Sequence, residues 1–309
     1  MGSPRHQFVH ADVADESAVD GAFRDFDPDA VLHLAAESHV DRSIDDPAAF
    51  LDTNVCGTFV LLEAALRHWS GLHGGRQARF RFVHVSTDEV FGTLAENGRF
   101  DATSRYVPNS PYAASKAAAD HFVRAWHRTY GLPAMVTNCC NNYGPRQHAE
   151  KLIPTVIRHA LADAPIPLYG TGGNTRDWLY VEDHVTGLMA ALHHDRPGET
   201  YLFGRRCEVR NLDLAGMICA LIDARRPRPD GKSYAQQITF VKDRPGHDWR
   251  YAIDPSHAEN VLAWKATERL ETGLAKTIDW YLANPGCLTP ANELGRLGTR
   301  TAEVVGATP

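Results

Sequence analysis

The sequence predicts an α/β protein in which helices cover a doubly wound parallel sheet and a smaller α/β lobe is attached. The first observation is a regular alternation of short apolar segments with amphipathic helical segments through residue 142. The second is a change of texture after Gly144, where loops rich in Pro and Gly separate shorter elements. Strand–helix alternation is typical of a parallel sheet, because a parallel crossover needs a helix to return the chain to the same edge.

The elements of the first part follow in order along the chain. Pro47 lies in the first turn of a long helix, where its missing N–H costs little, and Gly131 ends a second long helix. The expected strands are Gln7–His10, Ala30–Leu34, Phe80–Ser86 and Ala134–Cys139, and the expected helices are Ser17–Phe26, Pro47–Trp69 and Ser110–Tyr130.

The second part is expected to form the smaller lobe over the carboxyl edge of the sheet, where such sheets bind ligands. The expected helices are Lys151–Leu161, Glu182–Leu192, Leu212–Asp223 and Leu270–Leu282, the expected strands are Trp178–Val181 and Gln237–Val241, and Pro165–Asn174 is expected to be a loop. The sheet domain would then hold residues 1–142 and 175–205, and the lobe residues 143–174 and 206–285. Residues 286–309 lack periodicity and are expected to be a loose tail.

Composition limits the classes of function. The chain has 309 residues, of which 43% are hydrophobic and 23% charged, as in a globular enzyme. A formal net charge of −6 gives no overall attraction to nucleic acid or to an anionic membrane. The six cysteines show no Cys-x-x-Cys spacing, which favours a reducing, cytoplasmic compartment, and the sixteen histidines show no metal-ligand spacing. We find no apolar run of about 18 residues and expect no membrane span.

Tyr112 and Lys116 are the first candidate catalytic residues. Four residues apart on a helix, they share one face, and the Lys ammonium would lower the pKa of the phenol and make it a usable base. Such pairs occur by chance in many helices. Here, however, the pair follows an apolar strand that ends in further candidate catalytic residues.

That strand end supplies the hydroxyl of Thr87 and the carboxyls of Asp88 and Glu89. Two adjacent carboxyls whose pKa values differ can act as one acid and one base. The alternative is a solvated turn whose polar side chains only cap the following helix. That alternative does not explain why the carboxyl pair and the Tyr/Lys pair both fall at the ligand-binding edge.

Six segments combine into one pattern: His33–Ser43, Ser86–Gly92, Ser110–Lys116, Thr137–Pro145, Arg176–Asp183 and Asp243–His247. Together they resemble the extended short-chain dehydrogenase/reductase family, and within it the dTDP-glucose 4,6-dehydratases. The resemblance implies a Rossmann-like, dinucleotide-binding sheet domain and a nucleotide-sugar-binding lobe. Asp88 is the most discriminating residue, because related epimerases usually lack the carboxyl pair and related decarboxylases tend to have Ser-Glu there.

The resemblance implies a role for each catalytic candidate. Tyr112 would take the proton from the sugar's 4-hydroxyl while hydride leaves carbon 4 for NAD. Lys116 would keep Tyr112 ionised and contact the nicotinamide ribose, and Thr87 would hydrogen-bond the 4-oxygen. Glu89 would remove the hydrogen on carbon 5, Asp88 would protonate the departing 6-hydroxyl, and hydride would return to carbon 6.

The resemblance also implies two binding sets. The NAD set is Asp12, Val13, Leu34, Ala35, Ala36, Glu37, Ser38, Thr53, Tyr112, Lys116 and Asn142. The nucleotide-sugar set, for dTDP-glucose, is Ser38, Thr87, Asn141, Lys151, Leu152, Pro167, Leu168, Tyr169, Arg176, Asn211, Asp243, Arg244, Pro245, Gly246 and His247. The residues alone leave alternatives open, since Ala35 and Ala36 also suit tight packing and a single Arg is more often in a surface ion pair. Thymidine and uridine are not distinguished.

The family begins with a strand, a glycine-rich turn, a helix and a second strand, a unit of about 30 or more residues. Here the first recognisable element is the family's third strand, at Gln7. The chain could be a fragment of a longer protein, which we favour, a shortened member or an inactive copy. Because the glycines let the backbone approach a pyrophosphate, we expect weak or absent NAD binding and unpaired strand edges.

Two rival functions remain open. One is another nucleotide-sugar epimerase or decarboxylase, and the other is a non-catalytic protein that binds a nucleotide-sugar. The resemblance further implies a homodimer, paired through the helices Pro47–Trp69 and Ser110–Tyr130 in a four-helix bundle. Neither nucleic acid nor a membrane is expected as a partner.

Overall fold

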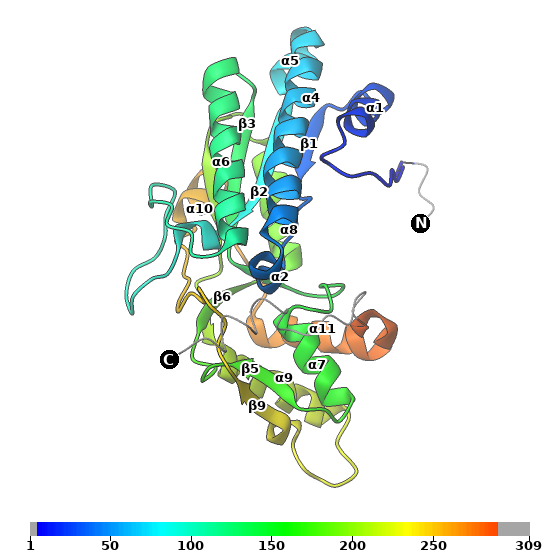
Figure 1. Cartoon of the computed structure of the whole chain (residues 1–309), viewed down its shortest axis with the longest axis vertical. Coiled ribbons are helices and arrows are strands. Elements are labelled where there is room, and N and C mark those ends of the chain that lie inside the picture. Colours follow the sequence, from blue (N-terminus) through cyan, green and yellow to red (C-terminus); the bar gives the residue numbers. More distant parts are fainter. Residues whose placement is uncertain (1–4, 290–309) are drawn as a thin grey trace.

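A four-stranded parallel sheet forms the larger of two parts in the structure, a computed structural model that describes residues 5–289 (Figure 1). Helices α4 (Gly57–Gly71) and α6 (Pro111–Tyr130) lie side by side over one face, and α8 (Val181–His193) covers the other. The strand order is β1-β2-β3-β7, with β1 at Ala30–His33, β2 at Arg81–Thr87, β3 at Ala134–Cys139 and β7 at Thr200–Phe203.

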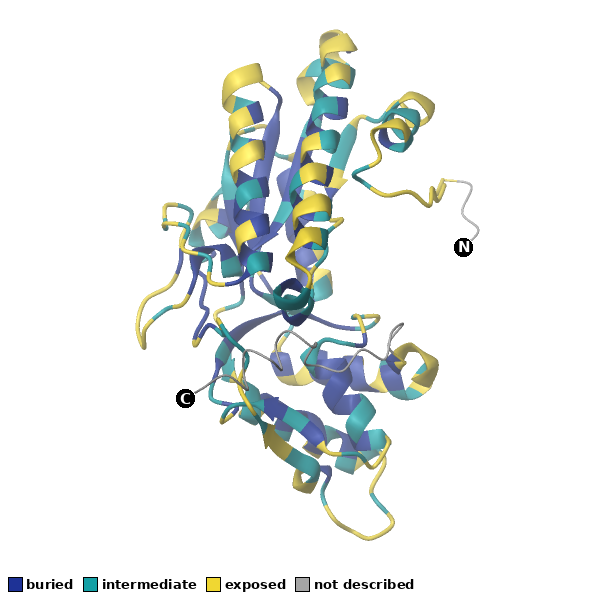
Figure 2. Ribbon diagram, viewed as in Figure 1, coloured by how far each residue is buried: buried dark blue, intermediate teal, exposed yellow. Residues whose placement is uncertain are grey.

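Successive residues of β2 pack against opposite layers, because side chains alternate across a strand. Phe82 joins a buried apolar cluster that contains Leu62 of α4 and Val123 of α6. Its neighbour Val83 joins a second cluster that contains Leu188 of α8. Strands β2, β3 and β7 are accordingly mostly buried between the helices, whereas β1, at the edge of the sheet, fully buries only His33 (Figure 2). The predicted doubly covered parallel sheet is confirmed.

The two long helices begin and end largely where the sequence predicts. In α6 the Ser110 hydroxyl accepts a hydrogen bond from the Ala113 N–H at 3.1 Å, and Gly131 ends the helix with φ of 76°. These are favourable residues at both ends. The other helix is continuous from α3 (Pro47–Phe50) into α4 but includes a π-helical stretch at Leu51–Cys56, which the sequence pattern did not predict.

The strand expected at Gln7–His10 is wrong. The segment is irregular, Phe8 is 72% exposed, and it pairs with no strand in the described part of the chain. β1 pairs with β2 on one side, and no described strand pairs with its other side, in line with the expected unpaired edge. An extended segment needs a neighbour to take its backbone hydrogen bonds, so a strand-like sequence without one stays irregular.

The smaller part packs three helices, α7 (Leu152–Leu161), α9 (Asn211–Arg225) and α11 (Leu270–Ala283), around one apolar core. Its strands are β4 (Asn141–Tyr143), β6 (Thr175–Tyr180) and β8 (Glu208–Arg210) in one sheet, and β5 (Ile166–Tyr169) and β9 (Ile238–Val241) in another. The remaining elements are α1 (Glu16–Phe26), α2 (Val40–Asp45), α5 (Gly74–Arg79), α10 (Ser256–Leu262) and 3-10 turns at Asp88–Phe91, Tyr234–Gln237 and Pro285–Leu288.

The loop expected at Pro165–Asn174 is wrong in its first half, because β5 pairs in parallel with β9. Pro167 misled the prediction. A proline is tolerated in a strand whose N–H side faces away from its partner, and in a two-stranded sheet both strands are edges. The tail expected at 286–309 starts as a short turn that buries Leu288, and residues 290–309 lie outside the described residues.

One helix, which we did not expect, is long and apolar enough to cross a membrane by length and composition alone. Pro47–Gly71 is long enough, with a mean hydropathy of 1.4 over its most apolar stretch. The sequence pattern did not reveal this apolar stretch because scattered polar residues interrupt it. In the structure this helix packs against α1 and α6, and the core helix of a globular domain passes the same test of length and composition.

Candidate active site

The turn that follows β2 holds the hydroxyl and the carboxyl pair at the carboxyl edge of the sheet. The Thr87 hydroxyl accepts a hydrogen bond from the Glu89 N–H at 3.3 Å and so starts the short 3-10 turn that carries Asp88 and Glu89. Asp88 is 2% exposed, and its Oδ2 has no hydrogen-bond partner among the described residues. An unpaired buried carboxyl oxygen is costly in a structural role and is common where a ligand binds.

Tyr112 and Lys116 enter the same site from α6. Both side chains are buried, at 8% and 3% exposure. The Thr87 hydroxyl and the carboxyls of Glu89 and Asp88 all act on the pKa of the Tyr112 phenol. The structure therefore brings the phenol, the hydroxyl and both carboxyls together, as the sequence predicts.

The Tyr112 phenol differs from expectation in its proton affinity. Burial raises its pKa well above the ordinary value, and the negative charge of Glu89 raises it further. The Lys116 ammonium donates to the backbone carbonyl of Val85 at 2.9 Å. The residues of this site alone do not yield a phenolate at neutral pH. The expected lowering by Lys116 is not seen: desolvation is the largest cause of the raised pKa, and the group that lowers it is Thr87.

The two carboxyls both hold their protons more tightly than free side chains do. Burial raises the pKa of Asp88 well above its ordinary value, and the neighbouring charge of Glu89 adds to the rise. Burial also raises the pKa of Glu89, but nearby cations oppose the rise. Asp88 is thus suited to donate a proton, and Glu89, beside the cations, is better suited to accept one.

Three cations from different elements surround Glu89. Arg244 precedes Pro245 in a lobe loop, Arg176 lies on β6, and Lys151 caps α7, and each favours the ionised form of Glu89. The Lys151 ammonium also donates to the Ser38 carbonyl at 2.6 Å. A cluster of buried cations at the mouth of a site is suited to a polyanionic ligand such as a pyrophosphate.

Arg176 is held by the protein rather than pointing freely into solvent. Its guanidinium donates to the carbonyls of Thr175 at 2.8 Å and Asp248 at 2.8 Å, and it stacks on the Tyr251 ring at 4.3 Å. These contacts fix the charge in place while consuming part of its hydrogen-bonding capacity. Arg176 is therefore better placed to attract an anionic ligand by its charge than to bind it through two parallel hydrogen bonds.

Of the residues predicted for the cofactor, Leu34–Ser38 follow β1 directly, and this segment is joined to α6 by hydrogen bonds. Asn54, in the π-helical stretch, fixes this segment: its Oδ1 accepts from the Glu37 N–H at 2.9 Å and its Nδ2 donates to the Ser115 hydroxyl at 2.8 Å. Leu34, Ala35 and Ser38 are exposed, Ala36, Glu37, Thr53 and Asn142 are half-buried, and Asn142 Oδ1 is a buried atom without a partner in the described chain. Asp12 is exposed and Val13 packs against Gly57.

The residues predicted for the nucleotide-sugar divide into two groups. Leu168 is 2% exposed and lies in the lobe's apolar core, with Leu152 packed against that core, so these two side chains face away from any ligand. Eight of the others are half-buried or exposed: Asn141, Pro167, Tyr169, Asn211, Asp243, Pro245, Gly246 and His247. His247 Nδ1 lies 2.6 Å from Asp243 Oδ1.

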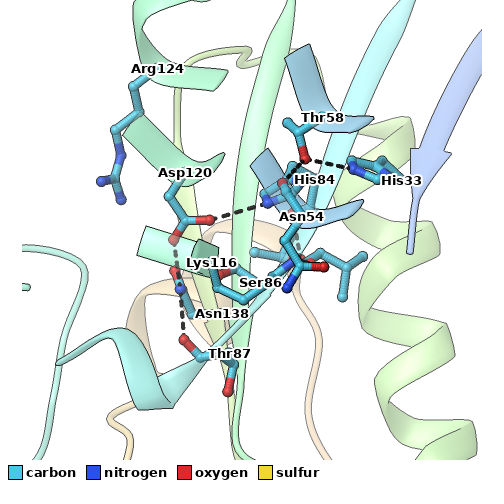
Figure 3. A network of polar contacts seen from close by, with 12 residues as sticks. His33, Asn54, Thr58, His84, Ser86, Thr87, Lys116, Asp120, Arg124 and Asn138 are labelled. Atoms are coloured by element: carbon cyan, nitrogen blue, oxygen red, sulfur yellow. Dashed lines mark hydrogen bonds and ion pairs between the residues drawn. The ribbon is translucent and has the colours of Figure 1, made fainter. Parts of the chain in front are cut away.

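Sequence reasoning missed two sets of residues. Asp41 contacts both Arg244 and Tyr169, and its place within the segment His33–Ser43 was the available signal. Asp120 lies one turn along α6 from Lys116, with its carboxyl beside His84 and Asn138 (Figure 3), and it also accepts a hydrogen bond from the Tyr106 hydroxyl. The spacing of four residues between Lys116 and Asp120 could have indicated it.

The fold and the site define an extended short-chain dehydrogenase/reductase. The match of a family model over residues 2–277 is more specific, and the chain belongs to the family described as GDP-mannose 4,6 dehydratase. A probable dTDP-glucose 4,6-dehydratase of Sinorhizobium fredii is 53% identical over 283 residues, 92% of this chain and 80% of that protein. A dTDP-glucose 4,6-dehydratase of Xanthomonas campestris is 52% identical over 301 residues, 96% of this chain and 86% of that protein.

Solved structures agree with the fold. The dTDP-glucose 4,6-dehydratase DesIV of Streptomyces venezuelae, solved with NAD bound, has a TM-score of 0.81 and 42% identity, covering 92% of this chain and 82% of that one. A UDP-glucose 4-epimerase of Thermus thermophilus, also solved with NAD, has a TM-score of 0.80 but 26% identity, covering 91% of this chain and 86% of that one. The higher identity to the dehydratase matches the presence of Asp88 beside Glu89.

Proposed function

We propose that this chain is a dTDP-glucose 4,6-dehydratase, which uses NAD to convert dTDP-glucose into dTDP-4-keto-6-deoxyglucose. The observation that carries the proposal is the convergence of the Tyr112 phenol with Thr87, Asp88 and Glu89 in one buried site. An oxidation needs the base, and an elimination needs an acid and a second base. This site holds all three beside one hydroxyl donor.

In the redox step, Tyr112 acts on the proton of the sugar's 4-hydroxyl and Thr87 hydrogen-bonds the same oxygen. Burial holds the Tyr112 pKa high, so a further positive charge is needed to ionise it. When bound, NAD supplies that charge on its nicotinamide ring, accepts hydride from carbon 4 and returns it to carbon 6. The Lys116 ammonium on α6, which donates to the Val85 carbonyl of β2, adds a second positive charge to the site.

The elimination uses the two carboxyls on the same turn. Once carbon 4 is a ketone, the hydrogen on carbon 5 is acidic enough for a carboxylate to remove, and Glu89 takes that proton and returns it to carbon 5 when hydride adds to carbon 6. Asp88, whose pKa burial raises well above its usual value, delivers a proton to the departing 6-hydroxyl. Because the acid and the base are adjacent in sequence, one rigid turn keeps both facing the same ring.

The residues present fit NAD at its nicotinamide end. Asn142 Oδ1 and Ser86 Oγ are buried polar atoms without partners in the described chain, and both residues contact Cys139 through another of their atoms. Glu37 and Ser38 extend this polar lining after β1. Tyr112, Lys116, Asn142 and the residues Leu34–Ser38 would hold the cofactor, with Thr53, Asp12 and Val13 towards its other end. The strength of NAD binding by this chain stays a prediction, for calorimetric titration to test.

The nucleotide-sugar would lie between the sheet's carboxyl edge and the lobe. Arg244, Arg176 and Lys151 supply the positive field for its pyrophosphate beside Glu89. Asn141, Pro167, Tyr169, Asn211 and Asp243 to His247 would surround the sugar and the base from the lobe, with the backbone of Leu152 and Leu168 behind them. Thymidine is the base in the substrate named for the relatives at about half identity.

We also propose a homodimer formed through α4 and α6. Their outer faces carry Phe59 at 43%, Phe122 at 36% and Tyr130 at 51% exposure. These rings pack around Trp126, with Phe59 at 5.7 Å and Tyr130 at 5.4 Å between ring centroids. Two such faces packed together would bury an aromatic stripe that is otherwise in water. A reducing, cytoplasmic location fits the six cysteines, all free and all within the described residues.

The test is to incubate the chain with dTDP-glucose and an excess of NAD and to measure the product by mass and by the alkaline absorbance of a keto sugar. Loss of one water from the sugar supports the dehydratase. Loss of carbon dioxide from a uronic acid substrate, or unchanged mass with inverted stereochemistry, supports the rival decarboxylase or epimerase. No product, together with tight binding of the nucleotide-sugar, supports the non-catalytic rival.

A further inference from the structure

Asp120 lies one helical turn beyond Lys116, on the same face of α6, and is fully buried. Its Oδ1 lies 3.2 Å from His84 Nε2 on β2. Its Oδ2 accepts hydrogen bonds from the Tyr106 hydroxyl at 2.7 Å and from Asn138 Nδ2 at 3.3 Å. Figure 3 shows this carboxyl directed towards His84 and Asn138, with Lys116 beside them.

The protonation states in this cluster follow from burial and hydrogen bonding. Burial lowers the pKa of His84 to about 4, so the imidazole is neutral at pH 7. Burial by itself would raise the pKa of Asp120, but the close approach of His84 at 3.2 Å and the charge of Lys116 outweigh it and lower the pKa. Asp120 is therefore an anion surrounded mainly by neutral donors.

Lys116 needs such an anion. Its ammonium is 3% exposed and donates to the Val85 carbonyl, which supplies a dipole and not a charge. Burial lowers its pKa, and the groups that oppose this are Asp120 first and Cys139 second. The pKa of the Cys139 thiol is about 12, so it stays neutral. Asp120 is therefore the negative charge that favours the protonated, ammonium form of Lys116.

The same carboxyl reaches the catalytic turn through Asn138. Asn138 Nδ2 donates both to Asp120 Oδ2 and to the Thr87 carbonyl, the latter at 3.0 Å. Thr87 is the residue whose side chain lowers the pKa of Tyr112. One buried acid thus acts on both supports of the redox site: its charge acts on the Lys116 ammonium, and Asn138 connects it to the end of β2.

We propose that Asp120 is a positioning residue of the redox step: its carboxylate keeps Lys116 an ammonium and, through Asn138, fixes the strand end that carries Thr87. The inference rests on the proposed function, since it explains how that site keeps its cation in a dry core. The polar and titratable groups that face the pair from neighbouring elements are His33, His84, Tyr106, Arg124, Asn138 and Cys139. Arg124 reaches the cluster through the Tyr106 hydroxyl, at 2.7 Å.

The test follows the Lys116 ammonium directly. The chain has six lysines, so lysine labelled with carbon-13 at Cε gives few NMR signals, and Lys116→Arg assigns the relevant one. In Asp120→Asn the titration midpoint of Lys116 is expected to fall by about one pH unit or more relative to wild type. Tyr106→Phe is the matched control: it removes a hydrogen bond to the same carboxyl but leaves its charge, and its midpoint should shift far less.

An unchanged Lys116 midpoint in folded Asp120→Asn would overturn the inference. If that variant does not fold, carbon-13 at Cγ of aspartate in the wild-type chain decides, because the inference requires Asp120 to be ionised at pH 7 and fails if it is protonated. In an active chain, the alkaline limb of the kcat profile should move to lower pH in Asp120→Asn and not in Tyr106→Phe. A wild-type chain without activity would contradict the proposed function alone, and the NMR titration would still decide the role of Asp120.

Discussion

Asp41 of α2 binds Arg244 of the lobe across the site, with 3.2 Å between Asp41 Oδ1 and the Arg244 guanidinium. The other oxygen of the carboxyl accepts from the Tyr169 hydroxyl at 2.7 Å. Burial alone would lower the pKa of Arg244, but the charges of Glu89 and Asp41 raise it. One carboxylate from the sheet domain thus fixes two residues that we propose for the nucleotide-sugar.

Asp41→Asn should therefore weaken substrate binding more than it slows chemistry. The loss of a charge-assisted hydrogen bond is expected to raise KM for dTDP-glucose by about 10-fold or more, with kcat little changed. Steady-state kinetics measure both. Asp46→Asn, an exposed position at the end of the same helix, is the matched control and should leave KM as in wild type. Equal effects of the two variants would contradict this role for Asp41.

Tyr112→Phe and Asp88→Asn should fail at different steps. Without the phenol oxygen, oxidation at carbon 4 should slow by about 10²- to 10⁴-fold, so no reduced nicotinamide accumulates. Asp88→Asn keeps that base, so reduced nicotinamide should form at a near-normal rate while loss of water is slow. Rapid-mixing absorbance and quenched-flow mass analysis separate the two steps. Equal loss of both partial reactions in Asp88→Asn would argue against the division of labour.

Asp88 should also lower the stability of the fold as the pH rises. Its folded pKa is raised above the ordinary value of 3.8, so the folded state holds this proton longer than the unfolded state. Stability from this group is then present at low pH and is lost as the pH rises towards the folded pKa. Asp88→Asn should melt as wild type does near pH 4 and about 2 °C or more above it at pH 8. A difference in melting temperature that does not grow with pH would contradict the buried, protonated carboxyl.

The proposed dimer interface predicts a change in mass in solution. Phe122→Asp places a charge in the aromatic stripe on α6 and should shift the protein from dimer to monomer in sedimentation velocity. Phe240→Asp, at a lobe position that is 57% exposed, is the control and should remain dimeric. A wild-type chain that sediments only as monomer would remove the proposal.

Much of the site could be predicted because local sequence fixes it. Ser110 and Pro111 set the start of α6, and that start places Tyr112 and Lys116 on one face. Thr87 ends β2 and caps the turn that carries both carboxyls. These features depend on neighbours within a few residues, which a sequence pattern records.

The rest depends on contacts between distant residues. The pattern at Gln7–His10 looks like a strand, but a strand also needs a partner, and the described chain offers none. Pro167 reads as a loop residue, yet β9, far along the chain, pairs with it. Asp41 and Asp120 were passed over because their partners Arg244 and His84 are not their sequence neighbours.

The most direct test of the account follows the hydrogen on carbon 4. The chain is incubated with dTDP-glucose deuterated at that carbon and with NAD in excess, and the product is examined by mass spectrometry and proton NMR. Because Tyr112, Asp88 and Glu89 act on one ring, the account predicts a keto sugar that has lost one water and carries the deuterium on carbon 6. Recovery of unaltered dTDP-glucose, or a product with deuterium still on carbon 4, would contradict it.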